Sequence, residues 1–198
     1  MIILMRHGQT QLNTKHLLQG RSDLPLNETG IRQARQAGDW FVSQGLSFSR
    51  VFASPYRRAI ATAQLASQQE EIVLDARLSE MDYGPYEGHD LTHPSPEIVT
   101  FFSDFVHNPA PAGMESLQEV VTRTGQFLEE IKEETGNVLV CTHAVAMKGC
   151  LESIDPVGTY WSYPIANCAL FALERTNGQW AKPVEIQWKD QNKTRMGG

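Results

Sequence analysis

The stretch Ile2–Gly8, IILMRHG, opens the chain with four apolar residues that are followed at once by an arginine, a histidine and a glycine. A short continuous apolar run is consistent with a strand that is buried on both faces. Runs of similar length recur at 51–53, 72–74, 138–141 and 168–173, and helical patterns separate them. Buried strands that alternate with amphipathic helices predict an α/β three-layer sandwich, with a mostly parallel central sheet flanked by helices.

Two of the expected helices are indicated by their periodicity and by their caps. The segment 28–41 places apolar residues on one face at the helical period, and Asn27 is a suitable N-cap. A second amphipathic pattern covers 117–131. Ser116 precedes it and Glu119 lies three residues after Ser116, which is the spacing of a capping box.

The length and composition indicate one globular domain. The chain has 198 residues, of which 41% are hydrophobic and 20% are charged. A chain of this length can form one domain with a sizeable core and is short for two domains. The last residues are polar and end in glycine. We therefore expect a single domain over residues 1–190 and a flexible tail over residues 191–198.

The charge and the cysteines restrict the class of protein. A net charge of −6 at pH 7 argues against nucleic acid as a partner, because such a surface needs a basic stripe. No segment approaches the ~20 apolar residues of a membrane-spanning helix, so we expect no membrane partner and a cytoplasmic protein. Cys141, Cys150 and Cys168 lie in apolar contexts without a CxxC motif. They are interpreted as reduced, buried thiols.

Two histidines follow expected strands directly. His7 comes after IILMR, and His143 comes after NVLVCT and before a helical pattern. Ligands of parallel α/β sheets bind beyond the carboxyl ends of the strands. A lone histidine is more often a hydrogen-bonded structural residue. Two at equivalent places favour a shared pocket, provided that the two strands are neighbours.

The segment 53–63, ASPYRRAIATA, predicts a third site at a strand end. Ser54 suits an N-cap and Pro55 suits the first helical position, which would place Arg57 and Arg58 in the first turn. Their charges oppose the helix dipole there, and an anion would compensate for this. Adjacent helical residues point about 100° apart, so only one of the two arginines is expected to enter a pocket. The physical argument does not choose between them.

Arginine, histidine and a carboxylate together match phosphoryl transfer without a metal. The loop 78–88, LSEMDYGPYEG, supplies the carboxylates Glu80, Asp82 and Glu87. The sequence has no HExxH, no Cys/His cluster and no phosphate-binding glycine loop of the P-loop kind, so we expect no metal and no cofactor. The remaining histidines are expected to be surface or loop residues; they are His16, His89, His93 and His107.

Six segments in this order resemble the histidine phosphatase superfamily, the phosphoglycerate mutase-like proteins. The segments are RHGQTQLN, QGRSDLPLNETGIRQA, ASPYRRAIATA, LSEMDYGPYEG, PAGMESLQEV and VLVCTHAVAMKG. The resemblance runs from residue 2 to about residue 150 and continues weakly over 166–173. It implies a phosphoglycerate mutase-like fold. Two positions differ from the family pattern: Leu12 stands where tryptophan is frequent, and Tyr56 where leucine is common.

The resemblance also implies roles for residues. His7 matches the nucleophile that becomes phosphohistidine, Glu80 matches the proton donor, and Arg58 rather than Arg57 matches the family arginine. The residues implied to bind phosphate are Arg6, Asn13, Arg58 and His143. We expect neutral His7 to attack phosphorus, protonated His143 to help stabilise charge on the oxygens, and water to hydrolyse the phosphohistidine.

The expected activity is hydrolysis of a small phosphorylated metabolite by a phosphoric monoester hydrolase. A mutase of the phosphoglycerate type is the alternative within the family, although such mutases resemble longer chains with inserted segments and a covering tail. A module that binds phosphoesters without turnover is the alternative outside enzymes, and intact His7 and Glu80 argue against it. Arg21 and Lys148 could add positive charge near the pocket, but each is more often an ordinary surface residue. The oligomeric state is not predicted.

Overall fold

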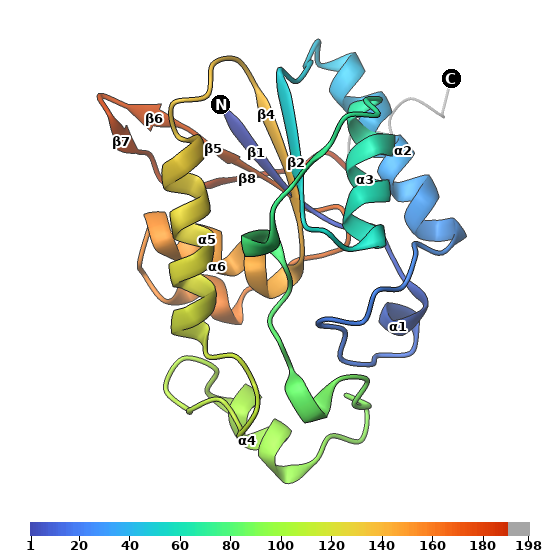
Figure 1. Ribbon diagram of the computed structural model, residues 1–198, viewed down its shortest axis with the longest axis vertical. Coiled ribbons are helices and arrows are strands. Elements are labelled where there is room, and N and C mark those ends of the chain that lie inside the picture. The colour runs from blue at the N-terminus through green and yellow to red at the C-terminus, as the bar shows by residue number, and fades with distance from the viewer. Residues whose placement is uncertain (190–198) are drawn as a thin grey trace.

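The computed structural model describes residues 1–189, and its central feature is a six-stranded sheet with the order β3-β2-β4-β1-β5-β8 (Figure 1). The strands of this sheet are β1 (Ile2–Arg6), β2 (Arg50–Ala53), β3 (Val73–Leu74), β4 (Val138–Thr142), β5 (Leu170–Leu173) and β8 (Val184–Ile186). A separate hairpin consists of β6 (Arg175–Thr176) and β7 (Gln179–Trp180). The expected flexible tail, 191–198, lies outside the described residues.

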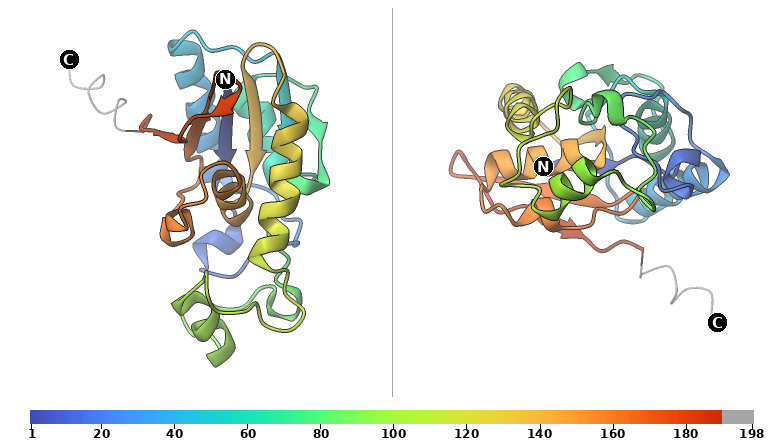
Figure 2. Two further views of the ribbon diagram at one scale, coloured as in Figure 1. Left: turned by 90° about the vertical axis from the view of Figure 1, so that its left-hand side faces the viewer. Right: turned by 90° about the horizontal axis from the view of Figure 1, so that it is seen from below.

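Helices connect and cover the strands. The α-helices are α1 (Gln11–Thr14), α2 (Glu28–Ser43), α3 (Arg57–Ser67), α4 (Pro96–Ser103), α5 (Leu117–Ile131) and α6 (Ala144–Ile154). Short 3₁₀ helices are η1 (Ala76–Leu78), η2 (Gly84–Tyr86) and η3 (Thr159–Ser162). Helices α2 and α3 lie on one face of the sheet, and α5 and α6 lie on the other (Figure 2). None of the helices within residues 1–189 is long and apolar enough to cross a membrane.

The sheet is mostly parallel, as predicted. Strand β1 runs parallel to β4, β4 to β2, and β2 to β3. Strand β5 is antiparallel to both of its neighbours, β1 and β8. The α/β three-layer sandwich expected from the alternation of strands and helices is therefore confirmed.

Alternate residues of the central strands enter two different cores. In β1, Ile2 and Leu4 pack toward α5 and α6, whereas Ile3 and Met5 pack toward α2 and α3. Strand β4 is buried at every position. Successive side chains of a strand point to opposite faces, so a strand between two helical layers must be apolar throughout. This burial on both faces explains the continuous apolar run at the start of the chain.

The predicted caps of α2 and α5 are confirmed, whereas the predicted start of α3 is wrong. Asn27 accepts the N–H of Gly30, and Ser116 forms the capping box of α5. Helix α3 begins at Arg57, not at Pro55. Ser54 instead continues the sheet, because its N–H donates to the carbonyl of Cys141. Its hydroxyl contacts the ring of His143 and does not cap the helix.

The carboxyl ends of β1 and β4 meet at one edge of the sheet. The N–H of His7 donates to the carbonyl of Thr142 at 2.9 Å, so the residue after β1 lies beside the residue after β4. The chain can leave β1 tightly because Gly8 approaches α2 closely. A Cβ at Gly8 would lie 2.5 Å from the carbonyl oxygen of Gly30. Helices α1 and α4 lie beyond this edge (Figure 1).

Candidate active site

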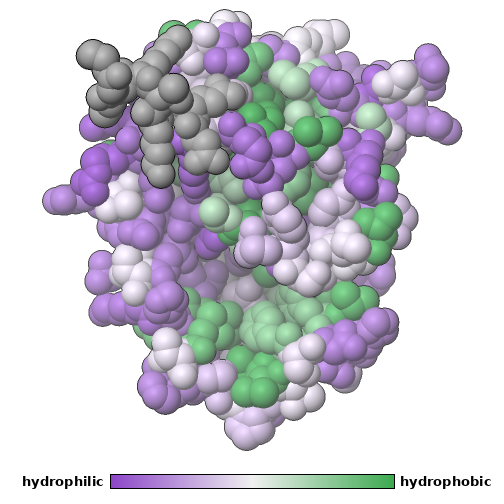
Figure 3. Space-filling view, turned by 180° about the vertical axis from the view of Figure 1, so that it is seen from behind, coloured by the Kyte–Doolittle hydropathy of each residue, from purple (hydrophilic) through white to green (hydrophobic). Residues whose placement is uncertain are grey.

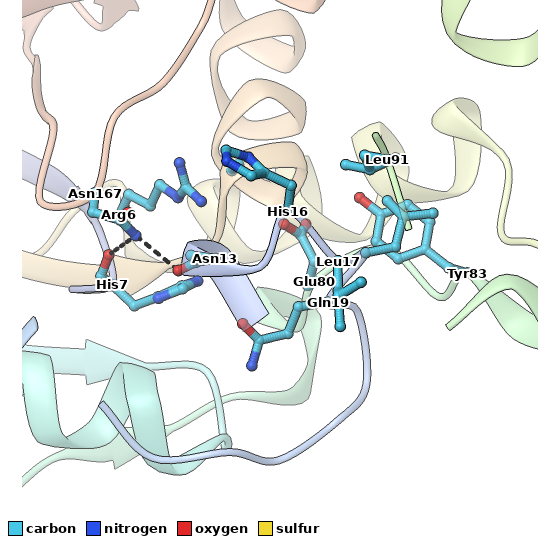
Figure 4. A pocket seen from close by; sticks show the side chains of 12 residues that line it. Arg6, His7, Asn13, His16, Leu17, Gln19, Glu80, Tyr83, Leu91 and Asn167 are labelled. Atoms are coloured by element: carbon cyan, nitrogen blue, oxygen red, sulfur yellow. Dashed lines mark hydrogen bonds between the residues drawn. The ribbon is translucent and has the colours of Figure 1, made fainter. Parts of the chain in front are cut away.

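A cavity of about 320 Å³ opens at the edge of the sheet where β1 and β4 end. Its lining residues are Arg6, His7, Asn13, His16, Leu17, Leu18, Gln19, Glu80, Tyr83, Leu91, Ala144 and Asn167. Figure 4 shows His7 and Asn13 on one side of this cavity and Tyr83 and Leu91 on the other. The predicted residues His7, Arg6, Asn13 and Glu80 therefore share one cavity.

The imidazole of His7 is 3% exposed and held in one orientation. Its Nδ1 lies 2.7 Å from the carbonyl oxygen of Gly8. Because a carbonyl only accepts, this contact assigns the ring proton to Nδ1 and leaves the lone pair on Nε2. Burial, Arg6 and Arg58 lower the pKa of His7 well below its usual 6.5. The direction of this shift could not be obtained from the sequence, and it favours the neutral, nucleophilic ring.

His143 lies next to His7, with 5.1 Å between the ring centroids, and it is completely buried. Its Nε2 is 2.8 Å from the hydroxyl of Ser54, and its Nδ1 accepts the Nε–H of Arg58 at 3.2 Å. Burial, Arg58 and His7 lower the pKa of His143 well below 6.5. These contacts and the lowered pKa favour a neutral ring in the free protein, and the expected protonation of His143 with a phosphoryl group bound stays a prediction.

Arg6 lines the cavity, and its side chain has an unused donor. Its Nη1 donates to the carbonyl of Ile165, whereas its Nε is buried without a hydrogen-bond partner among residues 1–189. Burial lowers the pKa of Arg6, and Glu80 opposes this shift. A buried donor without an acceptor is costly, so an anion that binds the Arg6 guanidinium at the cavity would be stabilising.

The structure separates the two neighbouring arginines that the sequence could not separate by physical argument. Arg57 is exposed and pairs with Asp23, its Nε lying 3.2 Å from Oδ2. Arg58 is completely buried, and its charge lies over the ring of Tyr56, with 4.9 Å from Cζ to the centroid. Tyr56 also contacts His143, with ring centroids 5.6 Å apart. The predicted choice of Arg58 thus matches the residue that adjoins the histidine pair.

Arg58 is held by a loop that a carboxylate organises. Its Nη1 and Nη2 donate to the carbonyls of Ser22 and Gly20 at 2.5 and 2.7 Å. The N–H groups of Gly20, Arg21 and Ser22 in turn donate to Glu87 at 2.9–3.2 Å. Glu87 therefore fixes the carbonyls that orient the Arg58 guanidinium.

Arg58 and His143 lie behind the wall of the cavity and do not line it. Both are completely buried, and their contact with a phosphoryl oxygen stays a prediction. A guanidinium has five N–H donors, and the hydrogen bonds found within residues 1–189 use one on each nitrogen of Arg58. Two donors thus remain for an anion that reaches them.

Glu80 faces the cavity from the loop before η2 and is 4% exposed. Its carboxylate accepts the N–H groups of Val145 and Ala146 at 3.0–3.2 Å, at the N-terminus of α6. It also accepts the N–H of Met81 at 2.9 Å. Glu80 is consequently fixed between the β4–α6 turn and its own loop, as a proton carrier at a defined position requires.

A partly buried ion pair between Arg123 and Glu115 holds the loop that carries Glu80. Arg123 donates to the carbonyls of Arg77 and Ser79 at 2.7 and 2.6 Å and to Glu115 at 2.6 Å. Glu115 accepts the N–H of Asp82 at 3.0 Å. The loop is thus held on both sides of Glu80 by residues far along the chain.

Several cavity residues were not identified from the sequence. Asn167 donates to the carbonyl of His7 at 3.1 Å and to Oδ1 of Asn13 at 3.2 Å, which leaves the amide N–H groups of Asn13 for a ligand (Figure 4). Gln19 has a buried Nε2 without a partner within residues 1–189. Gln19 opens the segment QGRSDLPLNETGIRQA, which resembles the superfamily, and its place in this segment could have identified it as a site residue.

His16 was expected at the surface, and it is exposed, but it also lines the mouth of the cavity. Its backbone φ of 55° lies in the left-handed region, which turns the chain there. His93 and His107 are exposed, as predicted, and pair with Asp90 and Asp104. Within residues 1–189, no group of three histidine, cysteine or acidic side chains is placed to hold a metal ion.

Comparisons with known proteins agree with this geometry. The sequence profile of the histidine phosphatase superfamily (branch 1) matches residues 2–185. The phosphatase PhoE of Bacillus subtilis (strain 168), named as uncharacterized, is 31% identical over 186 residues, which cover 90% of either chain. A protein of Salmonella choleraesuis (strain SC-B67) named "Probable phosphoglycerate mutase GpmB" is 29% identical over 189 residues, covering 90% of this chain and 86% of the relative.

A solved structure shows the same fold. The phosphoserine phosphatase mutant of Entamoeba histolytica, in complex with phosphoserine, superposes with a TM-score of 0.80. The match covers 94% of this chain and 95% of the other, at 22% sequence identity. At this identity the match supports the phosphoglycerate mutase-like architecture.

Proposed function

Because the chain belongs to the histidine phosphatase superfamily (branch 1) and is a phosphatase of that superfamily, we propose that it hydrolyses a small phosphorylated metabolite through a phosphohistidine on His7. The observation that carries the proposal is the orientation of His7. Its Nδ1 is held by the Gly8 carbonyl, so the lone pair of Nε2 is free in a cavity that also contains Arg6 and Glu80.

The reaction has two steps and needs no metal. In the first, Nε2 of His7 forms a bond to phosphorus while the ester P–O bond breaks, and the departing oxygen takes a proton from Glu80. In the second, water attacks the phosphohistidine and transfers a proton to Glu80, and the P–N bond breaks to release phosphate. Each step leaves the atoms and protons balanced.

Charge on the phosphoryl oxygens is stabilised mainly by guanidinium groups. Arg6 offers guanidinium N–H groups that have no partner within residues 1–189, and Asn13 offers amide N–H groups at the cavity wall. Arg58 acts from behind the wall, and neutral His143 orients it through the Nδ1 contact. Direct binding of phosphate by His143 requires its Nε2 to exchange Ser54 for the ligand. Preorganised donors of this kind stabilise the transition state because they need no reorientation.

Trapping the intermediate tests the proposal. The enzyme is mixed with a phosphate-labelled substrate, quenched in alkali during turnover and mapped by peptide mass spectrometry. We expect one acid-labile phosphoryl group on the peptide that contains His7 and none in His7→Ala. The exposed residue His93 supplies the control, since His93→Ala should be labelled as the wild type is. An active enzyme that never carries label on His7 would contradict the mechanism.

A mutase is the second candidate, because the relative from Salmonella carries that name. A mutase must protect phosphohistidine from water until the rearranged substrate is ready. The mouth of the cavity in this chain is lined by the exposed residues His16 and Leu91, which favours access of water. A panel of phosphomonoesters that includes phosphoglycerates, assayed for free phosphate and for isomers, decides between hydrolysis and mutase activity.

We also propose a cytoplasmic location. The three cysteines are buried and free, which suits a reducing compartment. Fractionation of cells that express the full chain with a tag would test this.

A further inference from the structure

A second cavity, of about 550 Å³, lies beside the first turn of α6. The end of α4, the start of α6 and η3 form its walls, and its lining residues include Phe102, Asp104, Phe105, Val145, Lys148 and Trp161. Five of the ten lining residues are aromatic or aliphatic, and the others include Ser103, Asp104, Lys148 and Ser162. Figure 3 shows hydrophobic residues gathered around a hollow at the end of the molecule where α4 lies. The cavity is therefore suited to a ligand that has an apolar body and also carries polar groups.

Lys148 places a positive charge in this apolar setting. Its Nζ donates to the carbonyl of Trp161 at 2.7 Å and lies 6.0 Å from the centroid of the Phe105 ring. Within residues 1–189 no carboxylate forms an ion pair with it; Asp104 pairs with His107 instead. Burial lowers the pKa of Lys148 to about 8, and Glu80 opposes this shift. A half-buried ammonium without a counter-ion is satisfied best by an anionic ligand.

Helix α6 contributes residues to both cavities. Lys148 lies four residues after Ala144, which lines the cavity of His7, so the two share a face of the helix about 6 Å apart along its axis. Helical side chains tilt toward the N-terminus, which here is the end that binds Glu80. Val145 belongs to both regions, because its N–H donates to Glu80 and its side chain lines the second cavity.

We propose that the second cavity is the subsite for the leaving group and that Lys148 binds an acidic group at its far end. The favoured substrates are then phosphomonoesters whose leaving group has an aromatic or similarly apolar body and ends in a carboxylate or another anion. The inference rests on the proposed phosphatase activity. A cavity of about 550 Å³ is larger than a carboxylate needs, which is why the leaving group includes an apolar body.

A matched pair of substrates tests the subsite. The phosphate ester of para-hydroxyphenylpropanoate and the corresponding carboxamide have nearly the same size and the same phenolic leaving oxygen, and they differ in one negative charge. The wild type should have a kcat/KM about tenfold higher for the acid, since a charge-assisted hydrogen bond contributes about 1.5–3 kcal/mol. Lys148→Met should bring the ratio of acid to amide close to one, and Lys148→Arg should preserve most of it.

A second lysine variant shows whether the change in the ratio of acid to amide is specific to Lys148. Lys132→Met removes a lysine that pairs with Glu129 on the far part of α5, and it should leave the ratio as in the wild type. Equal kcat/KM for acid and amide in the wild type would overturn the inference, as would an unchanged ratio in Lys148→Met. If Lys148→Met does not fold, the wild type and Lys148→Arg still give the ratio. Failure of the wild type to release phosphate from any ester contradicts the proposed function instead.

Discussion

The two sides of the catalytic cavity are built in different ways. The inner wall, which we define as His7 and Glu80 together with Arg58 and His143 directly behind them, comes from strand ends, a helix start and a loop, and these four residues are at most 4% exposed. The outer wall, which we define as Leu91 at the mouth of the cavity and Val99 of α4 outside it, comes from a loop and α4, and these residues are 43% and 52% exposed. The groups for the phosphoryl chemistry are therefore fixed by many contacts, whereas burial places little constraint on the exposed surface beside the mouth of the cavity.

Among the substitutions that compare the two walls, Glu80→Gln is expected to give the largest loss of kcat. The amide keeps the shape of the carboxyl group but supplies no acidic proton, so kcat should fall about 10³-fold for an alkyl phosphate. A nitrophenyl phosphate, whose leaving oxygen needs no proton, should lose much less. Steady-state assays of both esters measure the difference. Equal losses for the two substrates would show that Glu80 has a structural task only.

The adjacent arginines give the next test. Arg58→Ala removes the guanidinium beside the histidine pair and leaves the carbonyls of Gly20 and Ser22 and Nδ1 of His143 without a donor. The expected loss in kcat/KM is about 10²- to 10³-fold. Arg57→Ala, one residue away, removes an exposed pair with Asp23 and should change kcat/KM less than about twofold. Comparable losses in the two variants would remove the distinction between buried and exposed positions.

Glu87→Gln tests whether the inner wall depends on support behind it. The carboxylate accepts backbone N–H groups of the Gly20–Ser22 loop, and an amide nitrogen in its place would face those donors. We expect about a tenfold loss in kcat/KM together with weaker inhibition by vanadate, because Arg58 loses its orientation. Glu70→Gln, at an exposed position, is the matched control. Unchanged vanadate inhibition at lowered stability would assign Glu87 to the fold alone.

The parts of the site that were predicted correctly lie where the sequence constrains the backbone. A strand between two helical layers has to be apolar and has to end at the sheet edge, so IILMRHG and NVLVCTH located His7 and His143 together. The short helix α4 and the hairpin β6–β7 left no comparable pattern. The strand expected over 168–173 begins at Leu170, because Cys168 adopts a left-handed φ of 54°.

Contacts between distant parts of the chain could not be predicted from local sequence. The hydroxyl of Ser54 suits an N-cap, but it binds His143, which is 89 residues away. The support of Arg58 by Glu87 also spans different segments of the chain. The protonation of His143 depends on burial and on surrounding cations, which are properties of the folded molecule. The place of His16 at the cavity could not be predicted either, because it depends on the path of the loop that carries it.

The lowered pKa values of His7 and His143 predict that neither ring gains a proton at mildly acidic pH. Burial and the neighbouring arginines disfavour the protonated rings, so His7 and His143 should remain neutral as the pH falls from 7 to 6. Their ring resonances in the free enzyme, assigned with His7→Ala, should shift little over this range. A midpoint near 6.5 for His7 would show that the inner wall is more hydrated than its 3% exposure indicates.

The smallest effect on catalysis is expected on the outer wall, where two neighbours on α4 form a matched pair. Val99 is 52% exposed and Ile98 is 1% exposed. Val99→Ser should change kcat/KM for a small alkyl phosphate by less than about twofold and the free energy of unfolding by about 0.5 kcal/mol or less. Ile98→Ser leaves a void and buries a hydroxyl, so it should lower the free energy of unfolding by roughly 3 kcal/mol. Urea unfolding and initial rates measure both quantities. A large kinetic effect of Val99→Ser would mean that the exposed surface of α4 takes part in the phosphoryl chemistry, and the two walls would then no longer be separable by burial.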